Sequence, residues 1–306
     1  MSNIESLWKD YNTYEQNINA LVAKKMIDDR NKEYINARRA TKELESFQRV
    51  LLKNSPAIPP VGSADERKQL DSWRKYIEWE KSNSLRIEDK LTLTKRVIFA
   101  YKQCLLVMGH HPELWYEAAQ YLVRMSREMV DSGDMNGGKN LGDQASELYR
   151  RATNILMKQN PLIHFAYANF EEGRGKFEKV HQIYTKLTDI PSMDPTLTFI
   201  QYMRFARRAE GIKAARQVFR MAREDGRIKV RFCNVLVVHY TNSIQILFFQ
   251  FHVFIAAAWM EYYSAKDKNL AIKIFELGLK RFSDKPEYVR QYMDFMSNMN
   301  DDNNTR

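Results

Sequence analysis

The chain has 306 residues, of which 44% are hydrophobic, and it carries a formal net charge of +10. This apolar content is enough for a continuous core, and the charge favours acidic partners, RNA among them, without specifying a fold. Two cysteines provide neither a disulfide framework nor a CxxC zinc spacing, which indicates a reducing compartment. The N-terminus lacks the layout of a signal peptide, and outside residues 232–258 no uncharged run could span a membrane, so we expect no membrane partner.

The first predicted helix surrounds Trp8 and carries a pattern that returns along the chain: an aromatic residue, then Tyr or Ala, then Glu. Its copies are Trp8, Tyr11 and Glu15; Trp73, Tyr76 and Glu80; and His164, Tyr167 and Glu171, with His in place of Trp. A further copy begins at Trp115 and Ala118 and ends in Leu122 instead of Glu. Positions i, i+3 and i+7 share one helix face, so each copy predicts a helix whose aromatic face packs against a partner helix.

Between these helices the sequence predicts one long helix and two irregular stretches. Residues 18–53 contain neither Gly nor Pro and continue a helical pattern. Residues 54–60 hold three prolines, which block a helix and favour extended backbone. Residues 131–142 hold four glycines, and we expect a loop there. First turns of helices are predicted at Pro112, Pro161, Pro195 and Pro286.

A second motif, an aromatic residue followed three positions later by a small or apolar one, marks the second helix of each pair. Its landmarks are Tyr149, Tyr184, Phe219 and Phe275, and the first helices have matching landmarks at Tyr167, Tyr202, Ala258 and Tyr292. The spacing is 34 or 35 residues in both series, except for one step of 56 residues, which is 21 longer. Such a period is typical of a solenoid of helix pairs.

We therefore predict an all-α fold, an α-solenoid of about seven antiparallel helix pairs over residues 1–306, with the last pair incomplete. Neither end of the chain resembles a polar cap, so we expect an interior segment of a longer array. The aromatic landmarks should be buried between helices. They are Trp73, Tyr76, Trp115, Tyr149, Tyr167, Tyr184 and Phe219.

Five uninterrupted runs carry a closer likeness to known proteins. They are residues 7–15 (LWKDYNTYE), 75–83 (KYIEWEKSN), 109–122 (GHHPELWYEAAQYL), 205–213 (FARRAEGIK) and 273–280 (KIFELGLK). Together with the two helix motifs, they resemble the half-a-TPR repeats of the suppressor of forked family, the large scaffold subunit of cleavage stimulation factor. The likeness extends over nearly the whole chain, with one gap at about residues 230–250.

The resemblance implies a non-catalytic scaffold that acts in the nucleus, in cleavage and polyadenylation of pre-mRNA. It implies other cleavage stimulation factor subunits and polyadenylation factors as partners, and a homodimer through the later repeats. The alternative is a half-a-TPR scaffold of another RNA-processing pathway, splicing or rRNA maturation, that contacts RNA directly.

A strongly basic stretch, residues 204–231, contains ten Lys or Arg and three Asp or Glu. Helical spacing places Arg204, Arg207 and Arg208 on one face, and Arg216, Arg220 and Arg223 on another. These six arginines are candidate contacts for RNA or for an acidic partner. The alternative is a solvated outer face without a partner.

Residues suited to catalysis or metal binding occur without the spacing that such sites need. The six histidines fit neither HExxH nor a Cys/His finger. Cys104 follows Tyr101 by three positions, so it is the small residue of a second-helix motif and we expect it to pack in the core. The Gly-rich residues 133–142 lack a phosphate-binding pattern. We therefore expect no catalytic, metal or cofactor site, and no enzyme.

Residues 230–250 account for the 21 extra residues. Thirteen of them are apolar, many are β-branched or aromatic, and none is acidic, a composition that conflicts with a helical array. We hypothesise that these residues are translated from an intron that was not removed. The codons that can specify the residues at both ends of the segment include sequences that resemble splice sites. The alternative is a genuine insertion of the family. Sequencing transcripts across this segment decides the matter, since an insert present in every mature message excludes the intron.

Overall fold

The structure is a computed structural model that describes residues 4–228 and 250–299, and every regular element in these two ranges is helical. The predicted all-α helical-repeat fold is therefore confirmed. The chain forms two compact units, Met1–Lys158 and Gln159–Arg306. That both units form one continuous array over residues 1–306 remains a prediction. Among the described helices, none combines the length and the apolar composition that crossing a membrane requires.

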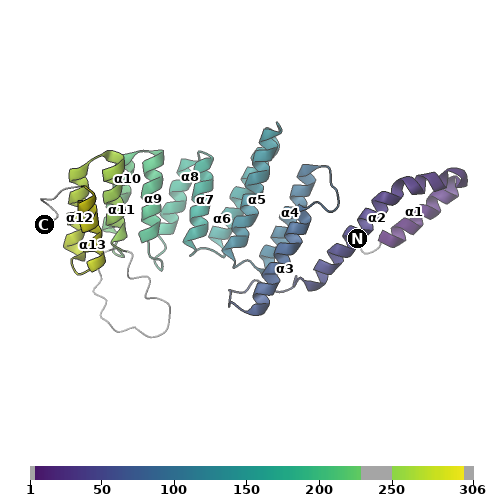
Figure 1. Ribbon diagram of the computed structural model, residues 1–306, viewed down its shortest axis with the longest axis horizontal. Coiled ribbons are helices and arrows are strands. Elements are labelled where there is room, and N and C mark those ends of the chain that lie inside the picture. The colour runs from purple at the N-terminus through teal and green to yellow at the C-terminus, as the bar shows by residue number, and fades with distance from the viewer. Residues whose placement is uncertain (1–3, 229–249, 300–306) are drawn as a thin grey trace. The chain divides into compact units, whose positions relative to one another are not determined.

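The first unit contains three helix pairs, and successive helices reverse direction at each connection (Figure 1). The helices are α1 (Ile4–Ile18), α2 (Ala20–Val50), α3 (Ala64–Lys81), α4 (Lys90–Val107), α5 (Pro112–Asp131) and α6 (Met135–Asn154). The predicted proline-rich loop is confirmed, because residues 51–63 join α2 to α3 without regular structure. In the first pair, Trp8 of α1 stacks on Tyr34 of α2 with ring centroids 4.4 Å apart.

The second unit continues the pattern with three pairs and one further helix (Figure 1). The elements are α7 (Pro161–Gly173), α8 (Phe177–Thr188), α9 (Thr196–Ala209), α10 (Ile212–Glu224), α11 (His252–Met260), the π-helical turn η2 (Glu261–Ala265), α12 (Lys268–Phe282) and α13 (Pro286–Asn298). Over both units the described residues thus provide six helix pairs and one unpaired helix, as the sequence predicts.

Local sequence signals explain where several helices begin. Pro112, Pro161 and Pro286 occupy the first position of α5, α7 and α13, where the missing N–H is not needed. Before α7, the Asn160 side chain accepts hydrogen bonds from the backbone N–H groups of Leu162 and Ile163. Pro195 directly precedes α9. These four predicted starts are confirmed to within one residue.

From α3 onwards, aromatic side chains from both helices of each pair contribute to the core. All seven predicted landmarks are buried, with at most 8% of each residue exposed: Trp73, Tyr76, Trp115, Tyr149, Tyr167, Tyr184 and Phe219. Landmarks from successive pairs meet directly, as Tyr184 of α8 stacks on Tyr202 of α9 with centroids 5.0 Å apart and planes 11° apart. The aromatic residues that recur along the sequence are therefore the residues that pack successive helix pairs together.

The Gly-rich residues 131–142, predicted to form a loop, are mostly helical. Only residues 132–134 form the turn, and α6 begins at Met135 and includes Gly137, Gly138 and Gly142. A side chain at Gly138 would overlap Val130 and the backbone carbonyl of Ser126 on α5. The Ser126 hydroxyl donates a hydrogen bond to the Gly138 carbonyl at 2.6 Å. The loop prediction was wrong because Gly138 allows a close approach of α5 and α6.

The connection from α10 to α11 is much longer than its counterparts. It comprises residues 225–251, whereas α6 and α7 are joined by residues 155–160 and α8 and α9 by residues 189–195. Removing 21 residues would leave a six-residue connection. Nevertheless α11 packs on α9 and α10, with the Phe219 and Phe254 rings 5.4 Å apart. The predicted insertion, residues 230–250, lies outside the described residues except for Gln250, and it stays a prediction.

We expect Gly278→Ala to destabilise the second unit. A methyl group at Gly278 would overlap the buried Tyr288 side chain, whose hydroxyl donates a 2.8 Å hydrogen bond to the Phe275 carbonyl. Overpacking and the loss of this bond should lower the free energy of unfolding by roughly 1–3 kcal/mol, more than the gain in helix propensity. Chemical denaturation measures the change. Gly173→Ala is the control, because nothing lies within 4 Å of a methyl group there; equal effects would contradict the packing role.

Candidate interaction surfaces

Two of the three glutamates of the first-helix motif form buried ion pairs with second helices. Glu80 of α3 accepts hydrogen bonds from Arg96 of α4 at 3.0 Å and from the Tyr76 hydroxyl at 3.0 Å. Glu171 of α7 lies 2.8 Å from Lys179 of α8. Their carboxylates are 5% and 0% exposed, so each charge needs its cation. These glutamates therefore hold the two helices of a pair together.

Glu261 extends this arrangement from one pair to the next. Its carboxylate is 2% exposed and accepts two hydrogen bonds from Arg216 of α10, at 2.8 and 2.9 Å. The hydrogen bonds to Glu261 raise the pKa of Arg216, so this guanidinium remains charged. Arg216, one of the six predicted contact arginines, thus already has a structural partner.

The six arginines occupy different surroundings in the second unit. Arg208 forms two hydrogen bonds of 2.8 Å to Glu172 of α7, and these raise the pKa of its guanidinium. Arg220 is exposed on α10, and the Arg223 guanidinium lies 5.9 Å from the ring centroid of Phe219. Arg204 and Arg207 of α9 line a groove. The structure therefore brings only Arg204, Arg207 and Arg208 together at one surface. Whether any of the six arginines contacts RNA remains a prediction.

This groove, which we call the α9–α11 groove, has a volume of about 590 Å³ and is bounded by α9, α11 and η2. Its apolar side chains include Ile200 and Met203 from α9, and Ile255 and Trp259 from α11. Tyr263 of η2 is 64% exposed at its edge. The α9–α11 groove thus combines an apolar floor with arginine side chains.

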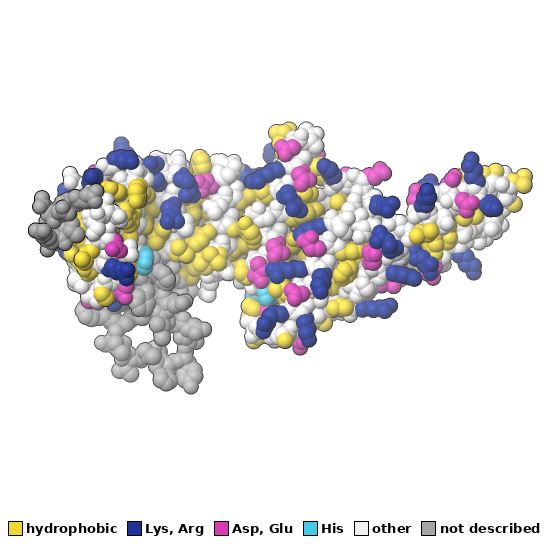
Figure 2. Space-filling model, viewed as in Figure 1, with side chains coloured by type: hydrophobic (Ala, Val, Ile, Leu, Met, Phe, Trp, Pro, Cys, Tyr) yellow, Lys and Arg dark blue, Asp and Glu magenta, His cyan; other side chains and the backbone are white. Residues whose placement is uncertain are grey.

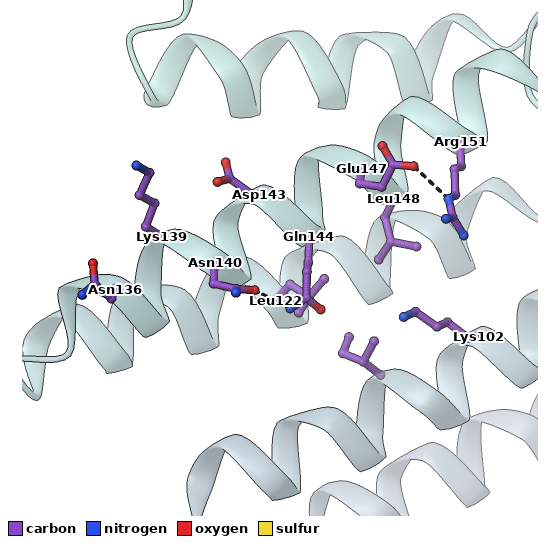
Figure 3. A pocket seen from close by; sticks show the side chains of 11 residues that line it. Lys102, Leu122, Asn136, Lys139, Asn140, Asp143, Gln144, Glu147, Leu148 and Arg151 are labelled. Carbon is purple, nitrogen blue, oxygen red and sulfur yellow. Dashed lines mark hydrogen bonds and ion pairs between the residues drawn. The ribbon is translucent and has the colours of Figure 1, made fainter.

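A second groove, of about 540 Å³, lies in the first unit beside α6 (Figure 3). Apolar Leu122 and Leu148 line it together with polar side chains of α6, among them Lys139 and Asp143. A dashed line in Figure 3 joins Glu147 to Arg151, whose ion pair measures 2.9 Å. Hydrogen bonds from Arg150 and Arg151 lower the pKa of Glu147 to about 2. A carboxyl group with so low a pKa is a weak base and holds no proton to donate at neutral pH.

Charges are mixed over the rest of the first unit. On the face drawn in Figure 2, basic and acidic side chains are interspersed over α3 to α5. Arg74 of α3, for example, lies 2.9 Å from Glu117 of α5. The positive net charge of the chain therefore forms no uniform basic face on this part of the surface.

Cys104, His164 and His111, which were considered as a nucleophile and as metal ligands, take part in packing and in contacts within the fold. Burial raises the pKa of the Cys104 thiol to about 12, so the thiolate is strongly disfavoured at neutral pH. Burial also lowers the pKa of His164, whose Nδ1 lies 2.9 Å from the Asn160 carbonyl oxygen. His111 contacts Glu66 and Glu113 through its two ring nitrogens. Within residues 4–228 and 250–299, no cluster of three His, Cys, Asp or Glu could hold a metal ion.

Stacked helix pairs with aromatic cores and buried glutamate–cation pairs define an α-helical repeat protein. The family model described as "Suppressor of forked protein" matches residues 1–246 and 245–306, so the chain belongs to the suppressor of forked family. The two matches meet inside residues 230–250, the predicted insertion. This membership confirms the resemblance that the sequence motifs carry.

Individual relatives agree with the family. The chain is 44% identical to protein suppressor of forked of Drosophila melanogaster, over 99% of this chain and 41% of the relative. It is 33% identical to cleavage stimulation factor subunit 77 of Arabidopsis thaliana, over 99% of this chain and 36% of the relative. The chain thus spans less than half the length of these relatives.

The fold also matches a solved structure. The crystal structure of CstF-77 superposes with a TM-score of 0.58 and 17% sequence identity, covering 100% of this chain and 56% of the other. At this identity the match concerns the fold alone. It supports the same helical-repeat architecture that the sequence period predicts.

Two features of these surfaces were not predicted from the sequence. The aromatic residues Trp259 and Tyr263 of the α9–α11 groove were not predicted as contact residues, although their i, i+4 spacing places them on one helix face. The cations that pair with the buried glutamates were also missed. Their offsets from the glutamates vary along the chain, so no fixed spacing could have identified them.

Proposed function

We propose that this protein is a non-catalytic scaffold in pre-mRNA 3′-end cleavage and polyadenylation, and that it acts in the nucleus. The observation that carries the proposal is the family match over the whole chain. The relative named as a subunit of cleavage stimulation factor supports the same pathway. Burial of Cys104, which raises the pKa of its thiol, agrees with a packing role for this residue rather than that of a nucleophile.

We further propose that its partners are the other subunits of cleavage stimulation factor and other polyadenylation factors. A homodimer through the later repeats belongs to the same proposal. The α9–α11 groove and the groove beside α6 give such partners surfaces to bind, because a helical-repeat array presents its helix faces rather than one enclosed cavity. Light scattering of the 306-residue chain tests the homodimer, and a monomer mass at micromolar concentration would contradict it.

Copurification tests the proposed pathway. The full-length gene product, tagged and purified from its own cells, should carry cleavage and polyadenylation factors, identified by mass spectrometry. A matched product without the region that corresponds to α3–α13 should lose them if this array holds the complex together. Recovery of spliceosomal or nucleolar factors instead would favour the alternative RNA-processing scaffold.

Direct RNA contact is the second candidate function. It is favoured by Arg204, Arg207, Arg220 and Arg223, which have no acidic partner among the described residues. Binding of an oligouridylate to the chain should then weaken steeply with salt, because each phosphate contact releases counterions. Affinity that is independent of salt, or unchanged by reversing these four charges, would remove this candidate.

A further inference from the structure

The α9–α11 groove carries positive charge that the described residues around it do not fully neutralise. Three arginines of α9 line it, and none of the lining residues within 4–228 and 250–299 is acidic. Arg208 is paired with Glu172, whereas Arg204 and Arg207 have no ion pair with any described residue. The Nε atom of Arg207 is buried and has no hydrogen-bond partner in the described part of the chain. The Arg207 side chain as a whole is partly exposed and lines the groove, so its guanidinium can pair with an acceptor supplied from outside.

The opposite wall of the groove is formed by α11 and η2, and it is largely apolar. Trp259 and Tyr263 stack with centroids 5.3 Å apart and planes 13° apart. Tyr263 and Ser264 belong to the π-helical turn η2, a rare backbone form that is frequent at functional sites. Tyr263 remains 64% exposed although it is a large aromatic residue. The wall is thus suited to cover a large apolar side chain.

We propose that the α9–α11 groove binds a segment of a partner protein that carries Asp or Glu beside large apolar side chains. The carboxylates would pair with Arg204 and Arg207, and the apolar side chains would cover Trp259 and Tyr263. Arginine suits this role, since its planar guanidinium binds a carboxylate through two hydrogen bonds. The proposal deepens the scaffold function proposed above and rests on it only for the existence of a protein partner.

Charge and lining favour such a peptide over RNA and over a second copy of this chain. Two unpaired arginines could neutralise about two phosphates, a small share of the contacts that hold nucleic acid in a groove. Most of the lining is apolar, which suits an amphipathic segment laid along the groove. A second copy of the chain carries the same positive groove and a net charge of +10, so we expect the homodimer proposed above to use another surface of the later repeats.

Peptide selection tests the inference directly. The probe is a displayed library of random peptides about 12 residues long, selected on the 306-residue chain. We expect enrichment of Asp or Glu three or four positions from Leu, Phe or Trp. The consensus peptide, labelled with fluorescein, should bind the double variant Arg204→Glu, Arg207→Glu at least about tenfold more weakly. The double variant Lys213→Glu, Arg220→Glu is the matched control, because it makes the same charge change at exposed positions of α10 outside the groove.

Exchanging the charges of the peptide and the chain distinguishes direct pairing of arginine with carboxylate from long-range electrostatic attraction. A twin of the consensus peptide with Lys in place of its acidic residues should bind the Arg204→Glu, Arg207→Glu variant better than the parent chain. Tyr263→Ala should weaken the acidic peptide without loss of helical circular dichroism. Selection without acidic enrichment, equal loss in the Lys213→Glu, Arg220→Glu control, or no gain from the exchanged peptide would each overturn the inference.

Two further measurements show whether RNA or a second copy of the chain binds in the α9–α11 groove instead. If fluorescein-labelled oligouridylate binds the parent chain and loses binding only in the Arg204→Glu, Arg207→Glu variant, the groove is an RNA site and the peptide inference is wrong. If that variant changes only the mass measured by light scattering, the groove is a contact between copies. Failure of peptide selection while copurification with polyadenylation factors persists would remove this inference and leave the proposed scaffold function intact.

Discussion

Phe275→Ala should lower the free energy of unfolding of the second unit by about 3–5 kcal/mol, because it leaves a cavity at the centre of an aromatic cluster. Phe275 is fully buried, and its ring lies 4.6 Å from that of Phe295 and 5.0 Å from that of Tyr292. Both neighbours belong to α13, so the cavity would loosen the contact between α12 and α13. Urea denaturation followed by circular dichroism measures the loss.

Tyr263→Ala is the matched aromatic control in the same unit. Its side chain is 64% exposed; it stacks on Trp259 and meets the Tyr262 ring edge-on, so we expect a cost of about 1 kcal/mol or less. If Phe275→Ala and Tyr263→Ala had similar effects, the aromatic landmarks of the second helices would not form the core. The control also shows whether the Tyr263→Ala variant used in peptide binding is folded.

Arg96→Met should destabilise the first unit by about 3 kcal/mol or more, because it leaves the Glu80 carboxylate buried without a cation. Glu80 is 5% exposed and would retain only the hydrogen bond from Tyr76. Adding Glu80→Gln should recover part of the loss, since the double variant no longer buries an unpaired charge. A double-mutant cycle by urea denaturation measures the coupling.

The control for Arg96→Met is Arg150→Met. Arg150 pairs with Glu147 at 2.6 Å, but their side chains are 54% and 41% exposed, so this pair should contribute no more than about 1 kcal/mol. Equal costs at Arg96 and Arg150, or no recovery by Glu80→Gln, would show that the motif glutamates do not depend on their cations.

The repeat could be predicted because its landmarks are large aromatic residues at fixed positions. Tyr149, Tyr184 and Phe219 recur at a constant interval because each fills the same space between neighbouring pairs, and the structure buries all three. The family resemblance rests on these motifs together with five uninterrupted runs, which also include exposed residues such as those of residues 7–15 in α1. Residues that pack the core in every repeat are thus visible in one sequence.

Contacts that depend on the neighbouring helix could not be predicted. The cation for Glu80 is 16 residues later in the chain, that for Glu171 eight residues later, and that for Glu261 45 residues earlier. The basic stretch likewise gives the density of arginines but not which are neutralised, since Glu172 and Glu261 lie on other helices. Gly138 was assigned to a loop because a sequence does not show how closely two helices approach.

The ion pair between Glu261 and Arg216 also has a consequence for local opening. It joins η2, which follows α11, to α10 of the preceding pair, so α11 and α12 cannot detach without leaving a buried carboxylate unpaired. The two pairs should therefore open as one cooperative unit, and amide hydrogen exchange in α10 and α11 should show the same protection. In Arg216→Met, protection in α11 should fall below that in α10, which would make the boundary between the two pairs a point of independent unfolding.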